Sequence, residues 1–159
     1  MNIVILSDEQ SVLEFKKEYE DIIKKAVDMT AGECSEDGIE VSVLITDNAG
    51  IREINREYRN IDSETDVLSF PMRDYDDEQN IIDDGGEAEV KLLGDIVISL
   101  EKAAEQGDLY GHGMLREIGF LTVHSMLHLY GFDHMDEDEK CIMRRKEEEI
   151  LKKMNLSVD

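Results

Sequence analysis

The chain has 159 residues, of which 41% are hydrophobic, and this suits one domain built around one core. Its net charge of -22 repels anionic membranes and bulk nucleic acid at long range, so any nucleic-acid substrate needs a local basic patch or a metal ion. No apolar run approaches the roughly 20 residues of a membrane span, and the apolar start lacks the basic leader of a signal peptide. Cys34 and Cys141 form no metal-like pair. We therefore expect a cytoplasmic protein with unpaired thiols.

The first half of the chain alternates predicted strands with predicted helices. Apolar or alternating runs predict strands at residues 2–6, 39–46 and 67–70. Amphipathic spacing predicts helices at residues 11–30 and from Asp47, a suitable N-cap, to about Tyr58. Pro71 follows the third strand directly, which is typical of an edge strand or a turn.

The second half begins with an acidic segment and becomes helical. Residues 74–89 are rich in Asp and Glu without a basic residue, which favours a surface loop or a hairpin extension. A further strand is predicted at residues 92–99. Glycines at 107, 111 and 113 then separate a short helix from a longer one, and Asp136 with Glu139 indicates the start of the last. The predicted helices are residues 99–106, 114–130 and 136–154.

The order of these elements predicts the fold class. It indicates a single α+β domain spanning residues 1–159, with a mostly four-stranded mixed sheet packed with about five helices. No internal repeat or second domain is indicated.

Three of the four histidines fall within one short run, which is the strongest functional signal in the chain. His124 and His128 are one turn apart on the predicted helix, with roughly 5–6 Å between Cβ atoms, so both imidazoles can bind one ion. Gly131 allows a left-handed exit from the helix that returns His134 as a third ligand. Three protein ligands leave one open position on a tetrahedral metal, as in catalytic sites. Zinc is the expected ion, although imidazole also suits copper, iron and nickel.

The histidine spacing also occurs in metzincin proteases, which place a glutamate general base directly after the first histidine. Ser125 occupies that position here, which disfavours peptidase chemistry. Glu117 faces broadly the same side of the helix and either orients a ligand or pairs with Arg116 or a backbone group. Asp133 either assists proton transfer or shapes the turn before His134. The remaining histidine, His112, is expected to have no metal role.

Three blocks of the sequence resemble the YbeY family of bacterial metal-dependent endoribonucleases, also called rRNA maturation factors. They are the histidine motif from His124 to His134, the segment at 55–71 with Tyr58-Arg59 and Thr-Asp-Val-Leu-Ser-Phe-Pro, and the Leu-Gly-Asp-Ile strand at 93–96. The blocks follow the family order, and the resemblance covers roughly residues 40 to 150. Phe132 and Ser125 replace a tyrosine and a glycine of many members, which removes no ligand.

The resemblance implies a zinc-dependent endoribonuclease that cleaves single-stranded RNA. It implies a role in maturing the 3′ end of small-subunit ribosomal RNA and in ribosome quality control. His124, His128 and His134 then hold the zinc, and Arg59 matches the arginine proposed to face the RNA. A guanidinium keeps its charge and binds phosphate with two parallel hydrogen bonds, although an ion pair with a nearby acid is the alternative for Arg59.

Two other functions remain open from the sequence. One is a zinc hydrolase with a non-RNA substrate, such as a peptide or small ester. The other is a metal-binding ribosome assembly factor that acts through ribosomal proteins or a GTPase, since an acidic surface fits basic partners. For RNA binding, we expect basic residues of the first half to lie beside the metal cleft on the first two helices. The candidates are Lys16, Lys17, Lys24, Lys25, Arg52, Arg56, Arg59 and Arg73.

Overall fold

The computed structural model describes residues 1–75, 81–83, 91–133 and 135–156. Its main sheet has four strands in the order β1-β2-β6-β3. The strands are β1 (Ile3–Asp8), β2 (Ile39–Thr46), β6 (Lys91–Ser99) and β3 (Val67–Pro71). β1, β2 and β6 run parallel, and β3 is antiparallel to β6 at the edge, where Pro71 is tolerated. The sheet is therefore mixed, as predicted.

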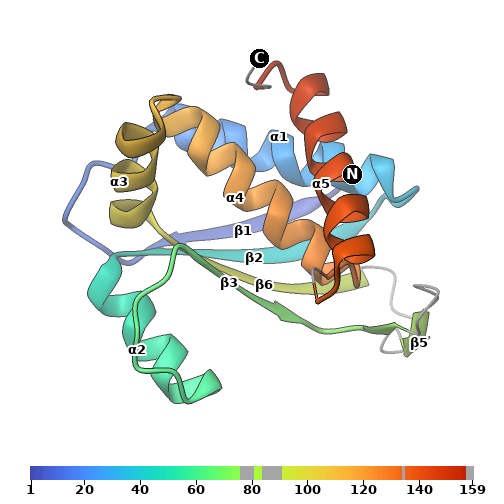
Figure 1. Ribbon diagram of the computed structural model, residues 1–159, viewed down its shortest axis with the longest axis horizontal. Helices are drawn as coiled ribbons and strands as arrows, with labels where there is room; N and C mark the ends of the chain where they lie inside the picture. The colour runs from blue at the N-terminus through green and yellow to red at the C-terminus, as the bar shows by residue number, and fades with distance from the viewer. Residues whose placement is uncertain (76–80, 84–90, 134, 157–159) are drawn as a thin grey trace.

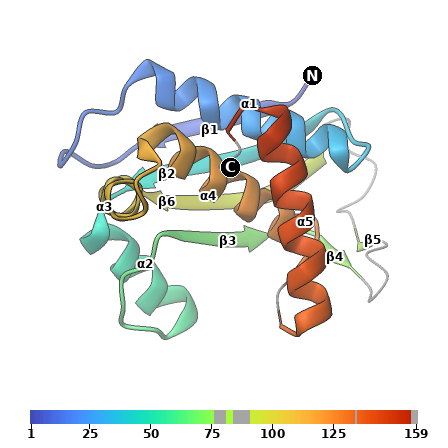
Figure 2. The same ribbon diagram turned by 45° about the horizontal axis from the view of Figure 1, so that its top comes forward.

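The helices lie on both faces of this sheet (Figure 1). They are α1 (Lys17–Glu33), α2 (Asn48–Arg59), α3 (Leu100–Tyr110), α4 (Gly113–Leu129) and α5 (Glu137–Lys153). Figures 1 and 2 show α1 and α4 on one face with α5 packed outside them, whereas α2 lies on the other face below β3. The predicted single-domain α+β fold is confirmed.

Helix α4 is the central helix of the molecule. It contacts the sheet, α1, α3 and α5, and its residues are buried on several sides, including Ile118, Val123 and Leu127. A helix that is apolar around most of its circumference is stable only in such a surrounded position. The predicted histidines are thus attached to the most constrained helix of the fold.

Local signals explain where the helices begin. Asp47 accepts a hydrogen bond from the Gly50 N–H at 2.8 Å, and Asp136 accepts one from the Glu139 N–H at 2.8 Å. The Glu139 carboxylate in turn accepts from the backbone N–H of Met135 at 3.1 Å, one residue before the cap. Both predicted N-caps are therefore confirmed.

Gly107 behaves differently from the prediction. It lies inside α3 rather than ending the helix. A Cβ at this position would lie 2.9 Å from the Gly113 carbonyl oxygen, which explains why the residue is a glycine. The glycine serves close packing against the start of α4. The helix ends instead at Gly111, whose φ of 73° is left-handed.

The acidic segment is described in part. β4 (Asp74–Tyr75) pairs antiparallel with β5 (Ile81–Asp83), which agrees with a hairpin extension. The rest of the predicted loop at 74–89 lies outside the described residues. None of the helices in the described ranges combines the length and the hydrophobicity that a membrane span requires.

Candidate active site

The C-terminal end of α4 brings two histidine side chains together. The Nε2 atoms of His124 and His128 lie 3.2 Å apart, with the rings nearly perpendicular. Two nitrogens bound to one tetrahedral zinc, each about 2.0–2.1 Å from it, lie about 3.3–3.4 Å apart. The observed separation therefore fits a shared metal ion.

The helix ends in a way that turns the chain back toward these imidazoles. Gly131 has a φ of 92°, its N–H donates to the His128 carbonyl, and the Phe132 N–H donates to the Leu127 carbonyl, both at 3.0 Å. This pair of bonds is the Schellman termination that a left-handed glycine permits. His134, the predicted third ligand, lies outside the described residues, so its role stays a prediction.

A carboxylate that sequence reasoning missed orients the first histidine. Glu147 of α5 is buried and accepts a hydrogen bond from Nδ1 of His124. A carboxylate at Nδ1 favours the tautomer whose Nε2 lone pair faces the metal. Glu147 lies on the buried side of α5 with Met143, Ile150 and Leu151. A carboxylate within that apolar stripe was the signal available in the sequence.

Glu117, which was one candidate for this orienting role, contacts a different histidine. Its Oε2 lies 2.7 Å from Nε2 of His112, and both side chains are largely buried. His112 also packs against the ring of Tyr110. The pair joins the start of α4 to the end of α3, which is consistent with a structural role for His112.

We expect the Glu147→Gln substitution to lower metal affinity about 10- to 100-fold, as loss of an orienting partner does at other metal sites. Glutamine can still accept the hydrogen bond, so the change removes the charge while the packing is kept. Competition with a chromophoric chelator measures this affinity. Glu149→Gln, an exposed change on the same helix, is the matched control. Equal affinities in the two variants would contradict the orienting role.

Ser125 faces the sheet instead of the cleft. It is fully buried, and its Oγ lies 2.5 Å from Oγ of Ser69 in β3. This contact ties α4 to the edge strand directly beneath the histidines. Ser125 thus supports the interpretation that no general base occupies the position used by metzincins.

A cleft of about 610 Å³ opens at the two histidines. Its walls come from β3 and the preceding loop, from the end of α4 with the turn after it, and from Arg59 at the end of α2. Residues that line it include Thr65, Asp66, Ser69, His124, His128 and Asp133. Arg59 and the histidines are distant in sequence, and the tertiary structure brings them to one cavity.

Arg59 is held at the edge of this cleft by the backbone and a ring. Its Nη2 donates to the Ser69 carbonyl at 2.9 Å, and its guanidinium lies 5.6 Å from the Phe70 ring centroid. Among the described residues it forms no ion pair with an acid, in contrast to the alternative that the sequence left open. The side chain is exposed, so its other N–H donors are accessible to a ligand in the cleft.

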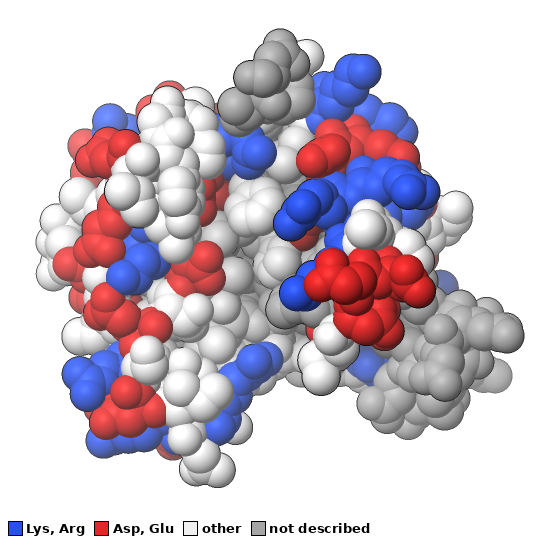
Figure 3. Space-filling view, viewed as in Figure 1, with Lys and Arg blue, Asp and Glu red and all other residues white. Residues whose placement is uncertain are grey.

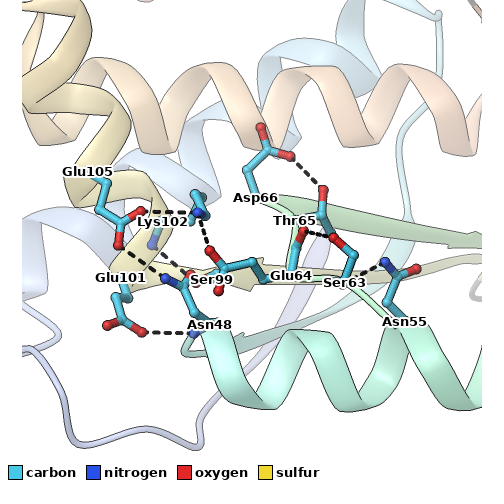
Figure 4. A network of polar contacts seen from close by, with 10 residues as sticks. All are labelled: Asn48, Asn55, Ser63, Glu64, Thr65, Asp66, Ser99, Glu101, Lys102 and Glu105. Atoms are coloured by element: carbon cyan, nitrogen blue, oxygen red, sulfur yellow. Dashed lines mark hydrogen bonds and ion pairs between the residues drawn. The ribbon is translucent and has the colours of Figure 1, made fainter. Parts of the chain in front are cut away.

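A polar network fixes the loop that precedes β3 (Figure 4). Lys102 of α3 binds Glu64, and the Asn55 amide of α2 donates to the Ser63 carbonyl at 3.0 Å. The Asp66 carboxylate accepts from the Val67 N–H at 2.7 Å and from the Thr65 hydroxyl at 3.3 Å. The network sets the position of Thr65 and Asp66 in the cleft wall.

The predicted basic patch on the first two helices is wrong except for Arg59. Five of its members pair with acids of the same region, and Arg59 is the one of the eight candidates that lines the cleft. The pairs involve Lys17, Lys24, Arg52, Arg56 and Arg73. These charges are neutralised locally, because acidic residues outnumber basic residues by more than two to one in this chain.

The fold and cleft define an α+β enzyme with two converging imidazoles and an accessible arginine. A family model described as Endoribonuclease YbeY matches residues 5–155. Proteins named Endoribonuclease YbeY from Clostridium botulinum (strain Loch Maree / Type A3) and Thermoanaerobacter sp. (strain X514) are each 45% identical to this chain. The alignments cover 97% and 98% of this chain and 99% of each relative. The chain belongs to the YbeY endoribonuclease family.

A solved structure of another protein has a similar fold. The solution structure of TM1509 from Thermotoga maritima matches with a TM-score of 0.57 at 19% identity, over 98% of this chain and 92% of that one. Family membership supports the endoribonuclease role in ribosomal RNA processing that the motifs indicate. It favours neither the assembly factor nor the hydrolase with a non-RNA substrate.

Proposed function

We propose that this chain is a zinc-dependent endoribonuclease that cleaves single-stranded RNA in the cleft at His124 and His128. The observation that carries the proposal is the convergence of the two Nε2 atoms, 3.2 Å apart, in a cavity that Arg59 also lines. His134 is proposed as the third ligand. Zinc held by these histidines would supply a Lewis acid for a phosphoryl oxygen and would lower the pKa of water to about 7.

The protein residues position the substrate and offset its charge. Glu147 holds the His124 ring through Nδ1, so that Nε2 stays directed at the cleft. Arg59, anchored on the Ser69 carbonyl and the Phe70 ring, presents N–H donors to a phosphate whose negative charge increases during attack. The attacking oxygen belongs to water or to an RNA 2′-hydroxyl. No side chain is assigned as general base.

The proposed biological role is based on membership of the YbeY family. We propose that the RNA is ribosomal, with maturation of the 3′ end of the small-subunit RNA and ribosome quality control as the processes served. Ribosomal proteins or an assembly GTPase are the proposed protein partners, since their basic surfaces suit a net charge of -22. We propose that the protein serves this role in the cytoplasm.

The test compares RNA cleavage by the metal-loaded protein, the chelator-stripped protein and the stripped protein after zinc is restored. We expect cleavage of a single-stranded oligoribonucleotide by the first and third samples, a loss of at least about a hundredfold in the second, and little cleavage of a duplex of the same sequence. Cleavage that is equal in stripped and loaded protein would indicate a contaminating nuclease. It would support the assembly-factor alternative.

A further inference from the structure

A second groove opens on the other side of His124, between α4 and α5, with a volume of about 420 Å³. His124 lines both this groove and the cleft that holds Arg59. The two cavities therefore meet at the same imidazole. Figure 3 shows basic side chains over the middle of α5, bordering the hollow centre of this face, and acidic side chains at the start of that helix.

Arg116 of α4 is a half-buried cation in the wall of this groove. Its guanidinium lies 5.4 Å from the Phe120 ring centroid, and its buried Nε has no hydrogen-bond partner among the described residues. Burial lowers the pKa of Arg116 from its ordinary value, although the charges of Glu117 and Glu147 oppose the shift. Arg116 lines the groove with a guanidinium that is only partly solvated, and a charged hydrogen bond from this group to an anion is stronger than one between neutral partners.

Two cations on α5 line the same groove. Within the part of the chain that the structure describes, Arg144 is exposed and makes no ion pair. Lys140 has one weak pair, with 3.8 Å between its Nζ and Oε1 of Glu137 on an exposed surface. Most of the basic candidates on α1 and α2 form ion pairs with acids. The groove cations differ from them, because their charges are less neutralised by neighbouring acids.

The acids in the groove offset only part of this charge. Glu147, which accepts a hydrogen bond from His124, and Glu148 are the two carboxylates that line the groove with three cations. The floor is apolar, with Phe120, Met143 and Leu151. An apolar floor reduces solvation around the cations and strengthens their attraction for an anion. The groove is thus a local positive site on a protein of strongly negative net charge.

We propose that the α4–α5 groove binds a backbone phosphate of the RNA strand through Arg116 and Arg144, next to the phosphate held at His124 and His128. The proposal rests on the proposed function and names where the strand continues beyond the cleft. Lys140 adds attraction at the outer edge. Because His124 borders both cavities, a strand with one phosphate in the cleft reaches the groove with a neighbouring part of its backbone.

The test measures binding without turnover. Fluorescence anisotropy follows a labelled 2′-O-methyl phosphorothioate oligonucleotide, which keeps the charge of each linkage but resists cleavage, on metal-loaded protein over a range of salt. The variants are Arg144→Gln, which changes an exposed side chain, and Arg116→Gln with Arg144→Gln. Arg145→Gln is the matched control, because it removes the same charge from the adjacent residue, which does not line the groove.

We expect the double variant to bind about tenfold more weakly than the parent, and Arg144→Gln to fall in between. The slope of log affinity against log salt should become shallower by about 0.7 for each phosphate contact removed. Arg145→Gln should stay within about twofold of the parent. Equal losses for Arg144→Gln and Arg145→Gln, or unchanged binding in all variants, would overturn the groove as an RNA site.

A parallel cleavage assay separates this proposal from the function on which it rests. If the parent cleaves RNA and both groove variants keep its KM, the groove proposal fails while the endoribonuclease stands. If the metal-loaded parent does not cleave RNA, the proposed function fails, and the binding series still decides whether the groove holds a phosphate. If the parent does not bind the oligonucleotide, the groove proposal is overturned, and the cleavage assay alone decides the proposed function.

Discussion

The His128→Ala variant should lose its bound zinc and cleave single-stranded RNA at least about a thousandfold more slowly than the parent. Removing this imidazole leaves His124 without the partner nitrogen that lies 3.2 Å from its own Nε2. A site that depends on few ligands does not tolerate the loss of one. Metal content by atomic emission and cleavage of a fluorescent oligoribonucleotide measure the two effects on the same preparation.

His112→Gln is the matched control for this experiment. It removes a histidine from the start of the same helix, and glutamine can still bond Glu117, so metal content and cleavage should both persist. Circular dichroism should show the same helix content in both variants, because His128 is partly exposed at the end of α4. Full zinc occupancy and full cleavage in His128→Ala would contradict the proposed metal centre.

Arg59→Glu should lower kcat/KM for RNA cleavage by about 100- to 1000-fold while the zinc content remains unchanged. The reversed charge places a carboxylate in the cleft where the guanidinium is proposed to meet the phosphate. Arg59 is exposed and contacts only one backbone carbonyl and the Phe70 ring among the described residues, so the fold should not depend on it. Steady-state cleavage and metal analysis together distinguish a loss of charge complementarity from a loss of the metal.

Arg56→Glu provides the control for Arg59→Glu, because Arg56 lies one turn earlier on α2 and pairs with Glu53 outside the cleft. Both variants change the net charge by the same amount. A general electrostatic effect on RNA association would affect them equally and would weaken at high salt. Unchanged RNA cleavage by Arg59→Glu would remove this arginine from the proposed site.

Local signals in the sequence were sufficient for much of the fold. The alternation in residues 39–46 and the caps at Asp47 and Asp136 depend on near neighbours, and the structure confirms them. Gly107 shows the limit of such signals. From the sequence, this glycine predicts the end of a helix. In the structure it lies within the helix, where the close approach of Gly113 leaves no room for a side chain.

The sequence likewise predicted some features of the candidate site and not others. The spacing of His124 and His128 required a shared helical face, and the glycine at 131 required a left-handed turn, because both follow from backbone geometry alone. The basic patch failed because it was inferred from a cluster of charges along the chain. Whether a lysine or arginine is neutralised depends on which acids the fold places beside it.

The sequence by itself determined the family, the α+β class and the helix that carries the histidines, since periodicity, caps and motif spacing are local properties. Only the tertiary structure decided that Glu147 of α5 orients His124, that Arg59 reaches the cleft through an anchor on β3, and that three cations line the groove between α4 and α5. Each of these contacts joins residues that are distant in the chain. Packing of the helices around α4 and the sheet sets them, and no short-range pattern encodes that packing.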